Sequence, residues 1–295
     1  MRQIHLAVMA LGLALVLAAC ETAIIEPEPT APPSPEPPSA SAGVPLDGAA
    51  REVLDAALAT QAAGTLRFAT DVRSADPDDP RPPATAGGFL AFDEPLRFRF
   101  GSPGLAEDAE PMEVIYDGMR AFIRGREVAF VPPDSWVVLD RATDGDAAID
   151  AFLGQYANQA LVLVPPLGVT SARQAGEEAI EGVVARHFVA QVDIERARAY
   201  LPQHLLASYD AQIETFRQRG APPTHELRVW VGPDGRIVRT SYVQVVSESL
   251  DETIEVTNEF GDFGAALDLA PPAGAEVLTL DEARERYSPS SAPIS

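Results

Sequence analysis

Lysine is missing from this chain. All 22 basic residues are arginines, and they stand against 44 acidic residues, for a formal net charge of −22. Binding of nucleic acid needs basic patches that neutralise phosphates, so this balance argues against a nucleic-acid partner. It argues equally against a broad electrostatic attachment to anionic lipid head groups. If the chain is held at a membrane, charge is not what holds it.

Cysteine is nearly absent, since Cys20 is the only one in the chain. One cysteine cannot form an internal disulfide, so the stability of the folded part must come from its core. Zinc sites built from several cysteines are excluded for the same reason.

The usual catalytic and metal-binding patterns are missing as well. Beyond Cys20 the histidines are His187, His204 and His225, and no two have the i,i+4 spacing of a helical zinc site. Ser208 and Ser241 do not lie in a G-x-S-x-G elbow. We therefore expect no metal, no cofactor and no enzyme activity; a hydrolase with an unrecognised site remains the alternative.

The N-terminus has the parts of an export signal. Arg2 precedes an uncharged apolar run at 6–17, which is shorter than the roughly 20 apolar residues of a membrane-spanning helix. Leu17-Ala18-Ala19-Cys20 then has the pattern of a lipoprotein signal peptidase site. We predict a signal peptide at 1–19 and lipidation of Cys20 with acyl chains such as palmitate. The alternative is an ordinary secretory signal with an incidental cysteine.

A proline-rich segment follows the cysteine. Eight prolines lie between residues 21 and 45, a composition that favours extended polyproline II structure. At about 3.1 Å per residue this segment would span on the order of 75 Å. We predict that 20–45 is a disordered tether; a proline-rich ligand for a partner domain is the alternative.

Residues 46–288 contain no second linker and are predicted to form one domain, with a disordered tail at 289–295. Helical periodicity is present at 47–62, 146–161 and 194–218. The remaining segments alternate with period two, as in strands with one wet and one dry face. Strands are predicted at 65–72, 88–101, 182–192 and 253–260, with two more within 127–140. Hairpins are predicted at 113–125, with Asp117-Gly118 as the turn, and at 225–246. The fold class is therefore α+β: a large antiparallel sheet with helices on one face.

The dry face of this sheet is rich in aromatic and aliphatic side chains. A sheet of eight or more twisted strands tends to curl, so helices over its mouth would enclose apolar space. That space is either filled by side chains or left open for a ligand. The candidate cavity residues are Phe68, Phe98, Phe100, Phe152, Tyr156, Leu205, Tyr209, Ile213, Val229, Ile254 and Val256.

Three segments, 176–193, 227–239 and 258–272, resemble LppX/LprG-type lipoproteins, a group with the LolA-like fold. The resemblance covers most of residues 46–275 and includes the lipidation site and the spacer. It implies a curved half-barrel of antiparallel strands with helices packed on its concave face, and an apolar cavity that holds acyl chains. It also implies an anchor on the extracytoplasmic side of the cell membrane.

On this basis we expect a lipoprotein that binds the acyl chains of a lipid or lipoglycan and carries them in the cell envelope, with an export partner. The alternative is an envelope sensor or adaptor that uses the same fold to bind a protein. An open apolar cavity favours the carrier, and a packed interior with an exposed apolar groove favours the adaptor.

Overall fold

The structure is a computed structural model of the whole chain. It describes residues 46–76, 83–102, 111–125, 134–156, 161–218, 223–247 and 252–287. Cys20, the signal peptide, the tether and the tail at 289–295 lie outside these residues, so those assignments remain predictions.

The described strands form a single large sheet in the order β12-β6-β5-β4-β3-β2-β1-β11-β10-β9-β8-β7. The first half is β1 (Thr65–Ser74), β2 (Ala84–Ala91), β3 (Arg97–Ser102), β4 (Met112–Tyr116), β5 (Arg120–Arg124) and β6 (Ser135–Asp140). The second half is β7 (Val169–Ile180), β8 (Val183–Asp193), β9 (Thr224–Val231), β10 (Ile237–Ser247), β11 (Glu252–Gly261) and β12 (Glu276–Thr279).

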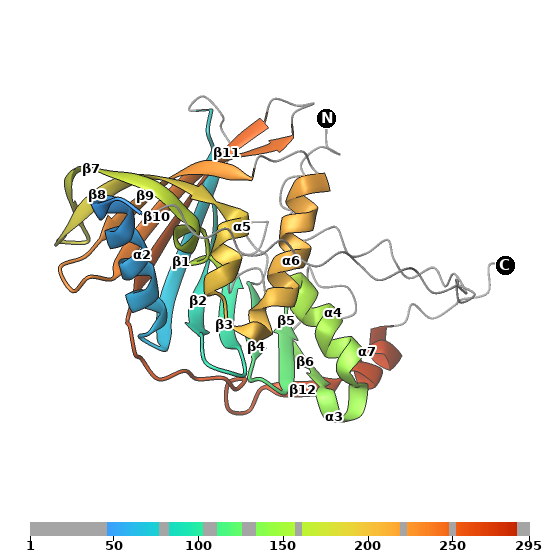
Figure 1. Cartoon of the computed structure of the whole chain (residues 1–295). Helices are drawn as coiled ribbons and strands as arrows, with labels where there is room; N and C mark the ends of the chain where they lie inside the picture. Colours follow the sequence, from blue (N-terminus) through green and yellow to red (C-terminus); the bar gives the residue numbers. More distant parts are fainter. Residues whose placement is uncertain are drawn as a thin grey trace, which may run out of the picture. The chain divides into compact units, whose positions relative to one another are not determined.

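Two antiparallel meanders, β1–β6 and β7–β11, meet where β1 pairs with β11, in a register that sets Phe68 opposite Phe260. The sheet curves strongly, as Figure 1 shows. One pair departs from the expected antiparallel pattern, because β12 runs parallel to β6 at the edge. The predicted α+β class and large sheet are confirmed.

The described helices are few. They are α2 (Gly48–Gln61), α3 (Arg141–Asp144), α4 (Asp146–Tyr156), α5 (Ile194–Ala197), α6 (Gln203–Gln218) and α7 (Leu280–Tyr287), with short 3₁₀ turns η2 (Pro165–Gly168) and η3 (Arg198–Tyr200). None of these helices is both long and apolar enough to span a membrane.

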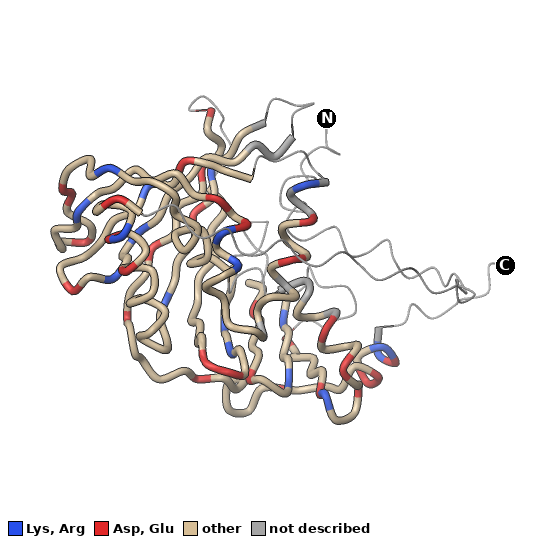
Figure 2. The backbone as a smooth tube through the Cα atoms, viewed as in Figure 1, with Lys and Arg blue, Asp and Glu red and all other residues tan. Residues whose placement is uncertain are grey.

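Alternation of side chains gives the sheet two distinct faces. The inner face, which carries Phe98 and Val229, is covered by α2 over β7–β10 and by α4 over β5 and β6 (Figure 1). The outer face carries Arg99 and Trp230. Acidic and basic positions are interspersed over many elements of the described chain (Figure 2).

Helix α2 is specified by its own sequence. Asp47 caps its N-terminus, with Oδ1 accepting a hydrogen bond from the amide of Ala50 at 2.6 Å. Ala50, Ala56 and Ala57 are buried and small, so the helix lies close to the strands beneath it. Its boundaries match the predicted helix at 47–62.

Several expectations need correction. The stretch 194–218 is not one helix: α5 and η3 come first, and α6 begins after Pro202, since proline disrupts a helix interior. The turn between β4 and β5 is Gly118-Met119, one residue later than the expected Asp117-Gly118, because the Asp117 amide donates to the carbonyl of Arg120 at 3.0 Å. Gly118 has φ of 99°, which fits the first position of a type II′ turn.

Other differences are missing elements. The sequence pattern did not predict β7, β12 or α7, and β2 begins at Ala84, before the strand pattern expected from residue 88. Of the two strands expected at 127–140, β6 is present and 126–133 lies outside the described residues. The helix expected at 146–161 is α4 to Tyr156, and 157–160 lies outside the described part.

Candidate functional site

An aromatic cluster joins α4 to the inner face of the sheet. The ring centroids of Phe98 and Phe152 are 6.3 Å apart with parallel planes, and Tyr116 lies 5.7 Å from Phe98 and 6.1 Å from Phe152. Phe100 extends the cluster, 5.8 Å from Phe98. Such contacts add about 0.5–1.5 kcal/mol per pair beyond their burial. In this state the aromatic rings occupy the space beneath α4.

Most of the predicted cavity residues are buried. Nine are at most 6% exposed: Phe68, Phe98, Phe100, Phe152, Leu205, Tyr209, Ile213, Val229 and Val256. Ile254 is half-buried near the start of β11. Tyr156 is the last residue of α4, and its side chain lies outside the described part. Alternation in the sequence thus identified buried positions, and their contact with a ligand stays a prediction.

Helix α6 is attached differently from α2. The Tyr209 hydroxyl donates to the carbonyl of Ile194 at 2.5 Å, and burial raises the pKa of that phenol. The helix also buries Leu205 and Ile213, and it takes part in two exposed ion pairs, Arg198–Asp210 at 2.8 Å and Arg217–Glu195 at 2.7 Å. No described strand packs against α6 as closely as β7–β10 pack against α2.

A polar row crosses the centre of the inner face. Thr70 Oγ1 donates to Asn258 Oδ1 at 2.8 Å, and Asn258 Nδ2 donates to Thr240 Oγ1 at 3.3 Å. Asn258 and Thr240 are buried, 2% and 1% exposed. Their strands β1, β11 and β10 are adjacent, so the three side chains form one ladder across the sheet.

His225 and Tyr242 lie beyond this row, toward the end of the sheet where β9 begins. Their rings are 5.7 Å apart, and both residues are half-buried. The Nε2 atom of His225 is buried and has no hydrogen-bond partner among the described residues. Burial lowers the pKa of His225 and raises that of Tyr242 to about 12, so both are neutral at pH 7.

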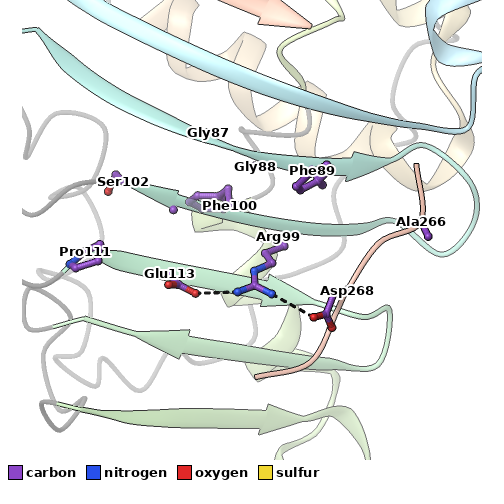
Figure 3. Close-up of a pocket in the computed structure, with 11 residues that line it drawn as sticks. Gly87, Gly88, Phe89, Arg99, Phe100, Ser102, Pro111, Glu113, Ala266 and Asp268 are labelled. Atoms are coloured by element: carbon purple, nitrogen blue, oxygen red, sulfur yellow. Dashed lines mark hydrogen bonds and ion pairs between the residues drawn. The ribbon is translucent and has the colours of Figure 1, made fainter. Parts of the chain in front are cut away.

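The outer face holds a pocket that sequence reasoning missed. Its volume is about 740 Å³, and it lies over β2, β3 and β4, with the irregular segment 262–275 along one side (Figure 3). Gly87 and Gly101 face each other on β2 and β3, so no side chain covers the backbone there. The remaining lining residues are Gly88, Phe89, Arg99, Phe100, Ser102, Pro111, Glu113, Ala266 and Asp268.

Charge in this pocket is already balanced. Arg99 extends toward Glu113 at 3.3 Å and toward Asp268 at 3.8 Å (Figure 3). Glu113 also pairs with Arg124 at 3.1 Å. Asp268 is 82% exposed, so its ion pair with Arg99 is weak. The pocket therefore offers no strong, unpaired charge for ligand recognition.

The segment 262–275 is fixed to the outer face by a small second core. Leu269 and Ala275 pack on the buried residues Ile115, Phe122 and Trp136. The amide of Gly264 donates to the carbonyl of Thr65 at 2.8 Å, which ties the start of the segment to β1. An irregular segment has no periodic pattern, so the sequence did not reveal this cover.

The described residues show no triad or metal cluster. His187 stacks on Trp230 on the outer face at 4.5 Å, and Ser241 donates to Glu255 at 3.2 Å. His204 is in α6, and its side chain lies outside the described part. Within the described ranges, no group of three His, Cys, Asp or Glu residues could hold a metal ion.

No family model matches this chain, and no curated protein matches it in sequence. Solved structures similar to it include LprF from Mycobacterium bovis, with 12% identity and a TM-score of 0.44 over 76% of this chain and 97% of that one. A LolA superfamily protein from Nitrosomonas europaea has 11% identity and a TM-score of 0.28 over 76% and 99%.

The lipoprotein LppX from Mycobacterium tuberculosis matches with 13% identity and a TM-score of 0.43, over 75% of this chain and 97% of that one. These TM-scores are all below 0.5. LppX, which the sequence segments resemble, is thus among the solved structures to which this chain is similar.

Proposed function

We propose that this protein is a membrane-anchored lipoprotein that binds the acyl chains of an amphiphile on the inner face of its sheet and carries them in the envelope. The observation that supports the proposal is the set of buried apolar residues on the inner face, with Phe68, Phe98 and Phe100 on β1 and β3 and Val229 on β9, beneath helices that bury apolar side chains of their own. Removing acyl surface from water contributes about 25 cal/mol per Å². Binding of this kind needs no catalytic group.

Entry of the acyl chains requires a cover that can move. Helix α4 follows the short helix α3 through Gly145, whose φ of 84° is favourable only for glycine. The ion pairs of helix α6 are exposed to solvent and add little to the buried contacts of Leu205, Tyr209 and Ile213. We propose that α4 and α6 move outward, so that hydrocarbon replaces the contacts of Phe152 with the sheet.

Native mass spectrometry tests this proposal. The full-length chain with Cys20→Ala, purified from its own host, should retain a phospholipid or glycolipid adduct. Recovery of the bare polypeptide mass alone would count against lipid carriage. A second preparation, refolded from denaturant without lipid, supplies the reference mass.

The adaptor function remains a second candidate because of β7. This strand is the last in the sheet, and residues 170–179 are exposed apart from half-buried Ala172. A free strand edge can pair with a strand of another protein. The test places a photo-reactive residue at Ala175 on β7, with the same residue at Asp281 on α7 as the control. Crosslinking of a single envelope protein from position 175 and not from position 281 would favour the adaptor function.

A further inference from the structure

The short helix α3 is bound to the sheet on one side of Gly145. The amide of Arg141 donates to the carbonyl of Met119 at 3.1 Å, in the turn between β4 and β5. Asp140, the last residue of β6, caps α3 by accepting a hydrogen bond from the amide of Ala142 at 2.8 Å. Helix α3 is thus tied to the sheet, and α4 begins directly after the glycine.

The side chain of Arg141 spans this junction. Its guanidinium forms an ion pair with Asp146, the first residue of α4, and lies 3.9 Å from Asp150, one turn further along the same side of the helix. The two carboxylates are 74% and 69% exposed, so each ion pair is weak on its own. The cation is carried by α3, and both anions are carried by α4.

The same guanidinium reaches the aromatic cluster beneath α4. Hydrogen bonds with the Tyr116 hydroxyl and with Asp146 raise the pKa of Arg141. The Tyr116 hydroxyl donates to the carbonyl of Gly118 at 2.9 Å, and its ring lies 6.1 Å from that of Phe152. Arg141 therefore connects the solvent side of α4 to the ring against which Phe152 packs.

We infer that Arg141 is a positioning residue that holds α4 closed over the sheet, so that acyl chains must break its contacts in order to bind. The inference rests on the proposed function, in which α4 moves outward and hydrocarbon replaces the contacts of Phe152. A change of backbone angles at Gly145 carries Asp146 and Asp150 away from Arg141. These contacts stabilise the empty, closed state and are lost in the loaded one.

This role has a consequence that a merely structural role does not share. A residue that stabilises only the empty state lowers the apparent affinity for the ligand, because ligand must pay for leaving that state. Loss of Arg141 should therefore make the protein less stable and yet tighten its binding of acyl chains. General damage to the fold would weaken both.

The test uses the full-length Cys20→Ala chain and a phosphatidylcholine with a pyrene-labelled acyl chain, delivered from vesicles of unlabelled phosphatidylcholine. We expect Arg141→Met to bind this lipid about threefold more tightly, the effect of losing an exposed ion pair, and to unfold at a lower denaturant concentration. Arg141→Lys, which keeps the charge, should lie between the two. Arg120→Met is the matched control, because Arg120 pairs with Asp117 at 2.8 Å within the β4–β5 turn, and it should bind like the parent.

Salt supplies a second readout. Because salt screens exposed ion pairs, raising NaCl from about 0.05 M to about 0.5 M should narrow the difference in affinity between the parent and Arg141→Met. A difference that persists unchanged in high salt would overturn the inference, since it would not come from the ion pairs.

The other outcomes separate the inference from the proposed function. Equal or weaker lipid binding by Arg141→Met, or a gain that Arg120→Met shares, overturns the inference and leaves acyl-chain binding intact. Failure of the parent chain to bind the pyrene lipid overturns both. Should Arg141→Met not fold, Asp150→Asn takes its place, with a smaller gain in affinity expected, and the absence of any gain overturns the inference.

Discussion

Helices α2 and α4 cover the same face of one sheet but are held to it in different ways. Helix α2 presents small residues and a buried hydrogen bond, in which the Ile237 amide donates to Thr60 Oγ1 at 2.9 Å. Helix α4 presents Phe152 and is connected through Gly145. On the proposed function, α2 is a fixed wall over β7–β10, and α4 is the cover over β3–β6 that must move to admit acyl chains.

Phe152→Ala should have the largest effect, because it removes a buried aromatic ring from the α4 contact. We expect the free energy of unfolding to fall by about 3–5 kcal/mol. Hydrogen exchange should accelerate in α4 far more than in α2. Equal acceleration in both helices would show that they form one cooperative unit and would contradict the contrast.

Thr60→Val tests the fixed wall. The substitution leaves the buried amide of Ile237 without its acceptor, which should cost about 1–3 kcal/mol in chemical denaturation. Exchange of α2 amides should increase while α4 is unaffected. Thr170→Val is the control, since Thr170 is exposed on β7 and bonds only to the carbonyl of Gln191 in the described structure. If Thr60→Val leaves the free energy of unfolding unchanged, the hydrogen bond from Ile237 does not hold α2 in place.

Gly145→Ala tests the connection of the movable cover. No atom lies within 4 Å of the added methyl group, so any effect must come from the positive φ. We expect a loss of about 1–2 kcal/mol from the strained backbone, confined by hydrogen exchange to α3 and α4. Gly274→Ala is the control, because Gly274 also has a positive φ and open space around it but lies far from α4 in the sequence. This variant should leave hydrogen exchange in α4 unchanged.

Arg198→Ala should have the smallest effect, because its ion pair with Asp210 is exposed. The hydrogen bond from Arg198 lowers the pKa of Asp210. Because the pKa of Asp210 is lower in the folded protein than its ordinary value of about 4, the ion pair stabilises the fold at pH values above that ordinary pKa. This stabilisation is lost as the pH falls through the pKa of the folded state. The variant should therefore match the parent in acid and differ slightly at neutral pH. A large difference at pH 7 would mean that α6 is not loosely held.

Local patterns in the sequence predicted much of this fold. Alternation placed Phe68, Phe98 and Val229 on the buried face, and helical periodicity predicted α2 to within one residue at each end. Strand β7 was missed because an edge strand exposed on both faces does not alternate. The outer pocket was missed because Gly87 and Gly101 become neighbours only through the register of β2 and β3. Long-range pairing of this kind leaves no local pattern.

The polar row of the inner face shows the same limit. Asn258 lies in a strand that the sequence predicted, but its partners Thr70 and Thr240 are far away in the chain and meet it only in the sheet. The inner face could therefore be predicted as apolar, while its polar row could not.

Photo-crosslinking with a lipid that carries a diazirine in its acyl chain tests the central claim most directly. The full-length Cys20→Ala chain would be loaded, irradiated, digested and mapped by mass spectrometry. The account predicts crosslinks to inner-face peptides that contain Phe98, Phe152 and Tyr209. Crosslinks confined to the outer pocket around Phe89 and Asp268, or none at all, would contradict it.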